Sequence, residues 1–132
     1  MLATSYGTIT ASGRASADSG YYVINNSTIA AASGQTVKKG AYYLGRPWRN
    51  YARVVFQLTS MTEVVNTAGW IQWSSSDPRT DQVTLAEYDN TGAGSKGTRA
   101  SFASTLSKPI AITTVLGSSY ASASWVDTAY IS

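Results

Sequence analysis

The segment 44–51, Leu-Gly-Arg-Pro-Trp-Arg-Asn-Tyr, holds the side chains with the clearest chemical potential. Pro47 fixes its own backbone and biases Arg46 toward an extended conformation, so that Arg46 and Trp48 should leave the chain on the same side. A guanidinium can donate two hydrogen bonds to a carboxylate, and an indole face offers a flat apolar platform. Two interpretations stay open: a cationic fork beside an aromatic platform, or a cation–π contact in which Arg46 covers Trp48 and neither binds a ligand.

A second aromatic group, Ala-Gly-Trp-Ile-Gln-Trp, follows at residues 68–73. One of its tryptophans, Trp70 or Trp73, should pack in the core, because tryptophan is usually mostly buried. The other would add aromatic surface near Arg46 and Trp48. Three tryptophans close in sequence beside an arginine favour a groove for carbohydrate, since sugar rings stack on aromatic faces.

The composition excludes several kinds of catalysis. The 132 residues include no His and no Cys, which removes Ser-His-Asp triads, thiol nucleophiles and most zinc sites. Any reaction would therefore depend on carboxylates, Arg, Tyr or Lys. The seven Asp and Glu residues show no pair poised for acid–base chemistry, and none lies in an apolar stretch that predicts a shifted pKa.

The chain carries a small excess of positive charge, formally +3. Its cations are scattered, with Lys38 and Lys39 as the closest pair, which argues against a nucleic-acid partner. A slightly positive surface explains the charge, while attraction to a polyanion, an acidic polysaccharide as well as RNA, stays open. No stretch approaches about 18 apolar residues, so we expect no membrane partner.

Short runs rich in β-branched and aromatic residues recur along the chain and predict strands. They lie at residues 7–10, 21–24, 42–44, 53–58 and 83–88. Residues 54–56 are apolar at consecutive positions, which is typical of a parallel sheet buried on both faces. The pattern predicts an all-β fold, with a sandwich, a barrel and a solenoid as the alternatives.

Two later segments carry weaker signals. Residues 89–97, Asp-Asn-Thr-Gly-Ala-Gly-Ser-Lys-Gly, predict a long surface loop rather than a phosphate cradle, because the Gly-Lys-Ser/Thr ending is missing. Residues 111–116 are too short for their periodicity to decide between a helix and a strand.

The sequence also bears on the compartment. Residues 25–28, Asn-Asn-Ser-Thr, contain two overlapping acceptors for N-linked sugar, which favour a secreted protein. The first five residues have neither the basic nor the apolar region of a signal peptide.

Three motifs in the same order resemble the C-terminal half of pectin methylesterases, especially the fungal ones. They are Tyr-Tyr-Leu-Gly-Arg-Pro-Trp at 42–48, Ala-Gly-Trp-Ile-Gln-Trp at 68–73 and Glu-Tyr-Asp-Asn-Thr-Gly-Ala-Gly at 87–94. The resemblance continues through residues 124–128 and covers nearly the whole chain. It implies a single domain over residues 1–132, part of a right-handed parallel β-helix, with a long C-terminal tail of loop and short helix.

The resemblance also implies a reaction, the hydrolysis of C6 methyl esters of polygalacturonate to pectate and methanol, without metal or cofactor. In the family one Asp attacks the ester, a second Asp acts as acid and then base, and Gln side chains hold the oxyanion. Arg46 matches the arginine that hydrogen-bonds the nucleophilic Asp and keeps it ionised. Trp48, Tyr43 and Trp73 match aromatic residues of the substrate cleft. The family is secreted, and its partner is pectin.

This chain departs from the family in its catalytic groups. No Asp matches either catalytic Asp, and Gln35 does not match the oxyanion position. We therefore expect a pectinesterase-family chain that is inactive in isolation. The alternative is a non-catalytic fragment that binds polygalacturonate, associates with itself, or docks onto a missing N-terminal half.

Overall fold

Each strand of the described chain pairs in parallel with a strand about one coil away in the sequence. The computed structural model describes residues 6–131, so the expectation for the first five residues lies outside it. The strands are β1 (Gly7–Thr10), β2 (Tyr22–Asn25), β3 (Thr28–Ile29), β4 (Tyr42–Gly45), β5 (Arg53–Gln57), β6 (Ser60–Met61), β7 (Thr84–Tyr88) and β8 (Ala103–Thr105). They form three parallel sheets with the orders β1-β4, β2-β5-β7-β8 and β3-β6.

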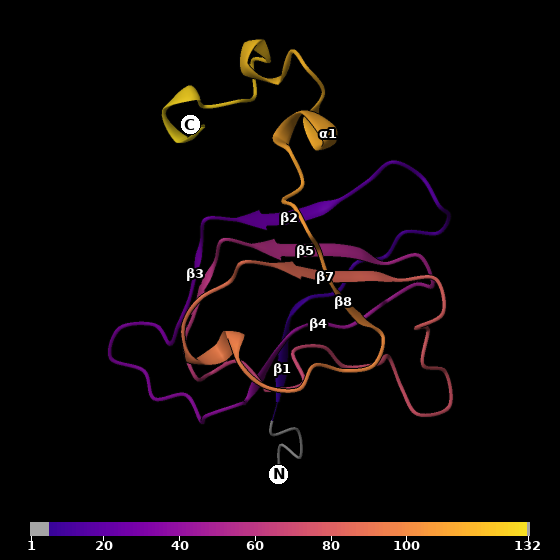
Figure 1. Ribbon diagram of the computed structural model, residues 1–132, viewed down its shortest axis with the longest axis vertical. Helices are drawn as coiled ribbons and strands as arrows, with labels where there is room; N and C mark the ends of the chain where they lie inside the picture. The colour runs from indigo at the N-terminus through magenta and orange to yellow at the C-terminus, as the bar shows by residue number, and fades with distance from the viewer. Residues whose placement is uncertain (1–5, 132) are drawn as a thin grey trace.

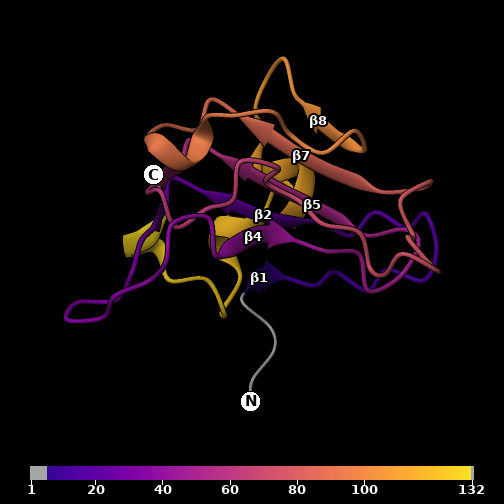
Figure 2. The same cartoon turned by 90° about the horizontal axis from the view of Figure 1, so that it is seen from below.

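The sheets make the body a stack of coils. Figure 1 shows β2, β5 and β7 lying one on another with their arrows in the same direction. In Figure 2, β1 and β8 lie on opposite sides of the body. The all-β prediction is confirmed for this body, and the parallel order selects stacked coils over a closed barrel. The predicted runs coincide with β1, β2, β4, β5 and β7, whereas β3, β6 and β8 were not predicted.

The centre of the largest sheet is β5. Its residues Val54, Val55 and Phe56 are fully buried, and the strand pairs with β2 on one side and β7 on the other. The prediction of a parallel strand buried on both faces is therefore confirmed. Each such side chain contributes about 1.5–3 kcal/mol by leaving water. Phe56 meets the Trp70 ring edge to face at 5.9 Å between centroids, which extends the core under the second aromatic motif.

Three successive coils turn at the same place with a left-handed residue. Asn26, Leu58 and Asp89 follow β2, β5 and β7 with φ of 45°, 52° and 46°. Asn and Asp tolerate this conformation, whereas most other side chains crowd the following carbonyl at a cost of about 1–2 kcal/mol. The N–H of Asn26 donates to Gln57 O at 3.1 Å, and that of Leu58 to Tyr88 O at 2.9 Å. Hydrogen bonds between coils thus hold the turns at Asn26 and Leu58.

The loop predicted at residues 89–97 packs closely on the preceding coil and contains the 3-10 helix η1 at residues 93–95. A Cβ on Gly92 would meet Met61 O, and one on Gly94 would meet Thr62 O, at 2.4 and 2.2 Å. Both positions therefore require glycine. Contact between backbones of successive coils explains the glycine content of this loop.

Arg99 ties this loop to the sheet. Its Nε and Nη2 donate to the two carboxylate oxygens of Glu87 at 2.7 and 2.9 Å. The two side chains are only 17% and 12% exposed. Arg99 also donates to the carbonyls of Thr67 and Gly94 at 3.0 Å. The guanidinium is thus held by charge and by hydrogen bonds in a place largely shielded from water.

A tail of short helices follows β8. Residues 111–116, which the sequence left undecided, form the helix α1 (Ile112–Leu116), followed by the 3-10 helices η2 (Tyr120–Ser122) and η3 (Thr128–Tyr130). The side-chain amide of Gln57 holds the residue that precedes the tail: its Oε1 accepts from Ile110 N at 2.8 Å, and its Nε2 donates to Ile110 O at 3.1 Å. The tail then passes beyond β2 (Figure 1). Within the described residues, no helix has the length and apolar character needed to cross a membrane.

We expect Glu87→Gln to lower the free energy of unfolding by about 3 kcal/mol, because it leaves the Arg99 guanidinium buried without its counter-charge. The matched control is Asp77→Asn, whose carboxylate pairs with Arg79 but is 54% exposed. That change should cost at most about 1 kcal/mol. Urea unfolding followed by tryptophan fluorescence measures both variants. Equal losses would contradict a structural role for the Glu87–Arg99 pair.

Leu58→Asn should raise the free energy of unfolding by about 1 kcal/mol, because Asn adopts the left-handed conformation with less strain. The loss of contacts is small, since Leu58 is 43% exposed. The reverse change one coil earlier, Asn26→Leu, should lower the stability by a similar amount. Thermal unfolding followed by circular dichroism compares the two. A destabilised Leu58→Asn chain would show that leucine packing outweighs the backbone strain.

Candidate functional site

The candidate site begins where β4 ends. Gly45 pairs with Thr10 of β1 and with Trp70 of the next coil. A Cβ on Gly45 would lie 2.2 Å from Thr10 Oγ1 and 3.1 Å from the Trp70 ring, so only glycine lets the three coils approach here. The Thr10 hydroxyl donates to Leu44 O at 2.8 Å. These contacts fix the point from which Arg46 leaves the sheet.

The Arg-Pro-Trp motif lies between segments of two other coils. On one side the N–H of Trp48 donates to Ser12 O at 3.0 Å. On the other side the N–H of Ile71 donates to Gly45 O at 3.1 Å. This parallel register brings the second aromatic motif beside the first, although they are far apart in sequence.

Arg46 stacks on Trp73, which reaches it from the neighbouring coil. The guanidinium carbon lies 4.5 Å from the centroid of the Trp73 ring. The cation–π partner is thus Trp73 and not Trp48, because pairing between coils sets the neighbour. The Arg46 side chain is half-buried, and its Nε has no hydrogen-bond partner among the described residues. No carboxylate in residues 6–131 forms an ion pair with it.

Arg79 is a second cation at Trp73, and sequence reasoning did not find it. Its guanidinium carbon lies 4.9 Å from the Trp73 ring centroid. Its Nε donates to Asp77 Oδ2 at 2.7 Å, and its Nη1 donates to Trp48 O. A turn after Trp73, in which Ser74 Oγ accepts from Asp77 N at 3.0 Å, brings Arg79 back to the site. The Ser-Asp-Pro turn residues were the signal that could have located it.

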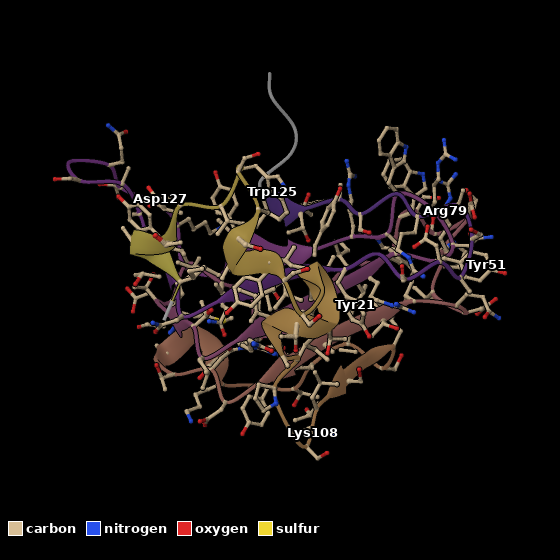
Figure 3. All side chains as sticks on the ribbon, turned by 90° about the horizontal axis from the view of Figure 1, so that it is seen from above. Tyr21, Tyr51, Arg79, Lys108, Trp125 and Asp127 are labelled. Carbon is tan, nitrogen blue, oxygen red and sulfur yellow. The ribbon has the colours of Figure 1, made fainter. Side chains whose placement is uncertain are left out.

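Trp48 is 54% exposed and borders two hollows of about 390 and 470 Å³. The charged and aromatic residues that line these hollows with it are Arg14, Asp18, Tyr21, Tyr22, Arg49, Tyr51, Arg53, Asp77 and Arg79. Figure 3 shows Arg79 and Tyr51 together at one end of the molecule, away from Asp127. Trp48 therefore forms an aromatic surface flanked by arginines.

Positive charge without a carboxylate partner gathers around Trp48. The ion pairs of the described residues are Arg14–Asp18, Arg79–Asp77 and Arg99–Glu87. Arg46, Arg49 and Arg53 take part in none of them. Arg53 lies over the Tyr21 ring at 4.4 Å, and its Nη1 donates to the backbone carbonyl of Asp18 at 3.3 Å. Three arginines outside the ion pairs of the described residues thus lie in the Arg-Pro-Trp segment or line the hollows beside Trp48.

Asp18 is the carboxylate with a shifted pKa, which the sequence did not predict. The Arg14 guanidinium, donating to Asp18 Oδ1 at 2.7 Å, holds the pKa of Asp18 below its ordinary value, and the Gly20 N–H at 2.8 Å adds to the effect. The cause is a charged partner in the same turn, not an apolar environment. Within residues 6–131, no three His, Cys, Asp or Glu side chains gather as a metal site.

Tyr43 lies apart from this group. Its ring meets Tyr6 edge to face, with 5.6 Å between centroids. Among the described residues, no ring pairing, cation–π contact or hydrogen bond joins Tyr43 to Arg46 or Trp73. The expectation that one tryptophan of the second motif packs in the core is confirmed by Trp70, which is 1% exposed.

Comparisons with known proteins match this chain to one family. A family model described as Pectinesterase matches residues 2–126. The pectinesterase of Aspergillus aculeatus is 62% identical over 123 residues, which cover 92% of this chain and 37% of that protein. A crystal structure of the pectin methylesterase of Aspergillus niger, with an N-acetylglucosamine stub on one asparagine, has a TM-score of 0.81. It is 38% identical and covers 95% of this chain and 40% of that one.

A plant protein agrees with the fungal ones. The pectin methylesterase from carrot has a TM-score of 0.70 and 32% identity, covering 80% of this chain and 35% of that one. The chain spans about 37% of the length of the Aspergillus aculeatus relative. The matched residues include both aromatic motifs, Arg46 and the glycine-rich loop. The chain therefore belongs to the pectinesterase family.

Proposed function

We propose that this chain forms the arginine- and tryptophan-bearing part of the pectin cleft of a pectinesterase. The whole enzyme would hydrolyse C6 methyl esters of polygalacturonate to pectate and methanol. One observation carries the proposal: the Arg46 guanidinium lies on Trp73 with a buried, unpartnered Nε and no ion pair to a described carboxylate. It lies in a motif that also carries the exposed Trp48.

In this proposal Arg46 holds a carboxylate nucleophile that other parts of the enzyme supply. A guanidinium beside a carboxylate favours its ionised form, typically by one to three pKa units. Two charge-assisted hydrogen bonds would also aim the nucleophile at the ester carbonyl. Stacking on Trp73 restricts the guanidinium before the carboxylate arrives, so less side-chain entropy is lost.

The aromatic residues bind the polysaccharide in this proposal. Trp48 offers an exposed indole face for a sugar ring, and the arginines beside it attract galacturonate carboxylates. Trp73 lines the cleft and supports Arg46. Tyr43, which packs on Tyr6, takes a more distant place along the same cleft. No metal or cofactor enters this mechanism.

We further propose that the coils belong to a right-handed parallel β-helix and that residues 1–132 act as one domain. Support comes from the in-register parallel pairing of β2, β5, β7 and β8. In a stack of this kind each coil contacts only its neighbours, so part of the stack can hold together.

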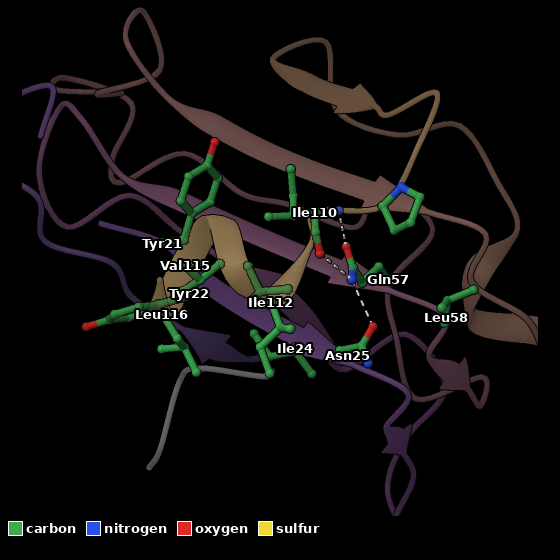
Figure 4. A pocket seen from close by; sticks show the side chains of 12 residues that line it. Tyr21, Tyr22, Ile24, Asn25, Gln57, Leu58, Ile110, Ile112, Val115 and Leu116 are labelled. Carbon is green, nitrogen blue, oxygen red and sulfur yellow. Dashed lines mark hydrogen bonds between the residues drawn. The ribbon is translucent and has the colours of Figure 1, made fainter. Parts of the chain in front are cut away.

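The partner in this proposal is the part of a pectinesterase that precedes the matched region. Within the described chain β2 pairs only with β5, which leaves one edge of the largest sheet open. Beside that edge, a groove of about 660 Å³ lies under α1 (Figure 4). Its lining includes Tyr22, Ile112 and Leu116, which are 55%, 40% and 40% exposed. Burial of this apolar surface would drive docking, with a second copy of the chain as the competing occupant.

We also propose that the protein works outside the cell. The support is the sugar stub on the related Aspergillus niger protein and the two acceptors at residues 25–28. Pectin is a cell-wall polymer, so an extracellular place agrees with the proposed substrate.

The isolated chain should release no methanol from highly methylated pectin above the background rate, because it lacks the nucleophile through which the reaction passes. Gas chromatography of methanol measures the rate, with the full Aspergillus aculeatus pectinesterase as the positive control. Turnover by the purified chain would overturn the proposed absence of a nucleophile and direct attention to its own carboxylates.

Mixing the chain with the separately produced N-terminal part of the Aspergillus aculeatus enzyme should restore methanol release. In the mixture, Arg46→Ala should lower the rate about 10- to 100-fold, the value of a charge-assisted hydrogen bond. The control is Lys108→Ala, which replaces an exposed residue and should leave the rate unchanged. Arg99→Gln is unsuitable as a control because it disturbs the fold. No restored activity, together with light scattering that shows a dimer of this chain, would favour the second copy as occupant.

The chain alone should bind oligogalacturonide with a Kd of about 1 mM or weaker, because only half of the cleft is present. In an NMR titration the indole N–H signals of Trp48 and Trp73 should shift. Those of the buried Trp70 and of Trp125, which is 68% exposed on the tail, should stay. Four unmoved indole signals would exclude binding at this surface.

A further inference from the structure

We propose that Asn26 carries an N-linked oligosaccharide in the folded chain and that the overlapping acceptor Asn25 does not. The inference rests on the extracellular location proposed above. Residues 25–28 read Asn-Asn-Ser-Thr, so Ser27 completes an acceptor for Asn25 and Thr28 completes one for Asn26. The surroundings of the two asparagines differ.

Asn25 is the last residue of β2 and, although exposed like Asn26, it has an amide oxygen that takes part in the hydrogen-bond network of the fold. Its Oδ1 accepts from Gln57 Nε2 at 2.8 Å. Gln57 is 4% exposed and bonds both backbone groups of Ile110. Asn25 also lines the groove under α1 (Figure 4). A bulky, hydrophilic sugar on Asn25 would have to share that apolar groove with Ile24 and Leu116.

Asn26 lies at the corner between β2 and β3 and is exposed. Its backbone N–H donates a hydrogen bond to Gln57 O at 3.1 Å. Its side chain makes no hydrogen bond within the described part of the chain. Asn adopts its φ of 45° readily. A sugar on Asn26 therefore leaves every described contact in place.

The choice also matters for the docking surface. A sugar on Asn25 would fill the groove beside the open edge of β2, where the N-terminal part of the enzyme is proposed to bind. A sugar on Asn26 projects from the turn that follows this strand. A sugar on Asn25 would thus interfere with assembly, whereas a sugar on the adjacent Asn26, which does not line the groove, would not.

The transfer forms a bond between Asn26 Nδ2 and C1 of the first sugar of a lipid diphosphate-linked oligosaccharide. The bond between C1 and the diphosphate oxygen breaks, and the lipid diphosphate leaves with the electron pair. A base of the transferase takes the amide proton. The co-reactant is the donor common to N-glycosylation in the secretory pathway, so the chain supplies only the acceptor.

Two single changes separate the acceptors. Ser27→Ala destroys the Asn25 acceptor and keeps the one at Asn26, whereas Thr28→Ala does the reverse. Each chain would be expressed in yeast behind a secretion signal, with a further acceptor in the linker to report entry into the secretory pathway. Digestion to a single N-acetylglucosamine and peptide mass spectrometry then give the occupancy of each asparagine.

We expect the original chain and Ser27→Ala to carry the sugar on Asn26, and Thr28→Ala to lose it at least tenfold in the secreted protein. A sugar on Asn25 in the original secreted chain would overturn the proposal. So would an unmodified Asn26 in chains whose linker acceptor is filled. Neither result depends on methanol release, so this test and that of the proposed function can fail separately.

Discussion

Parallel hydrogen bonding between successive coils is the constraint on which the other features of this chain depend. Because the register is kept from β2 through β5 and β7 to β8, a side chain meets the residue at the equivalent position of the next coil. Gln57 reaches Asn25 for this reason. In the neighbouring sheet the pairing of Gly45 with Trp70 brings the segment after Trp70 beside Arg46, which reaches the Trp73 ring three residues further on. The same close stacking leaves no room for a side chain at Gly45, where a Cβ would meet Thr10. The need for glycine at position 45 and the contact between Arg46 and Trp73 therefore both depend on how closely the coils stack.

Arginine has two different environments in the fold. Arg99 is saturated, with both Glu87 oxygens and several carbonyl groups as partners, and it fastens a loop to the sheet. Arg46 is held by an aromatic ring instead, which orients the guanidinium without neutralising it. A cation prepared in this way keeps its hydrogen-bonding capacity for a partner from outside. The two arginines therefore differ in their partners, a carboxylate and carbonyl groups for Arg99 and an aromatic ring for Arg46.

Much of the body could be predicted from the sequence, because the long runs are dominated by burial. Val54, Val55 and Phe56 are apolar in succession because both faces of β5 are covered. The strands β3, β6 and β8 have two or three residues, too few for a pattern. The motif residues were identified through family resemblance, but their contacts were not. Trp73 on Arg46, Arg79 on Trp73 and Arg14 on Asp18 depend on turns and on pairing between coils.

The Gln57 amide, which bonds both backbone groups of Ile110, makes the last hydrogen bonds between the coils and the tail among the described residues. Residues 112–131 contain no strand and no buried side chain, so they lack the contacts that resist local opening. Hydrogen exchange would therefore be fast along this segment and slow in β5, with Ile110 marking the boundary. Opening of this segment would expose the groove residues of β2 without breaking a strand pair. The lining of the groove therefore combines a well-protected strand, β2, with the segment of the body's surroundings that has the fewest contacts.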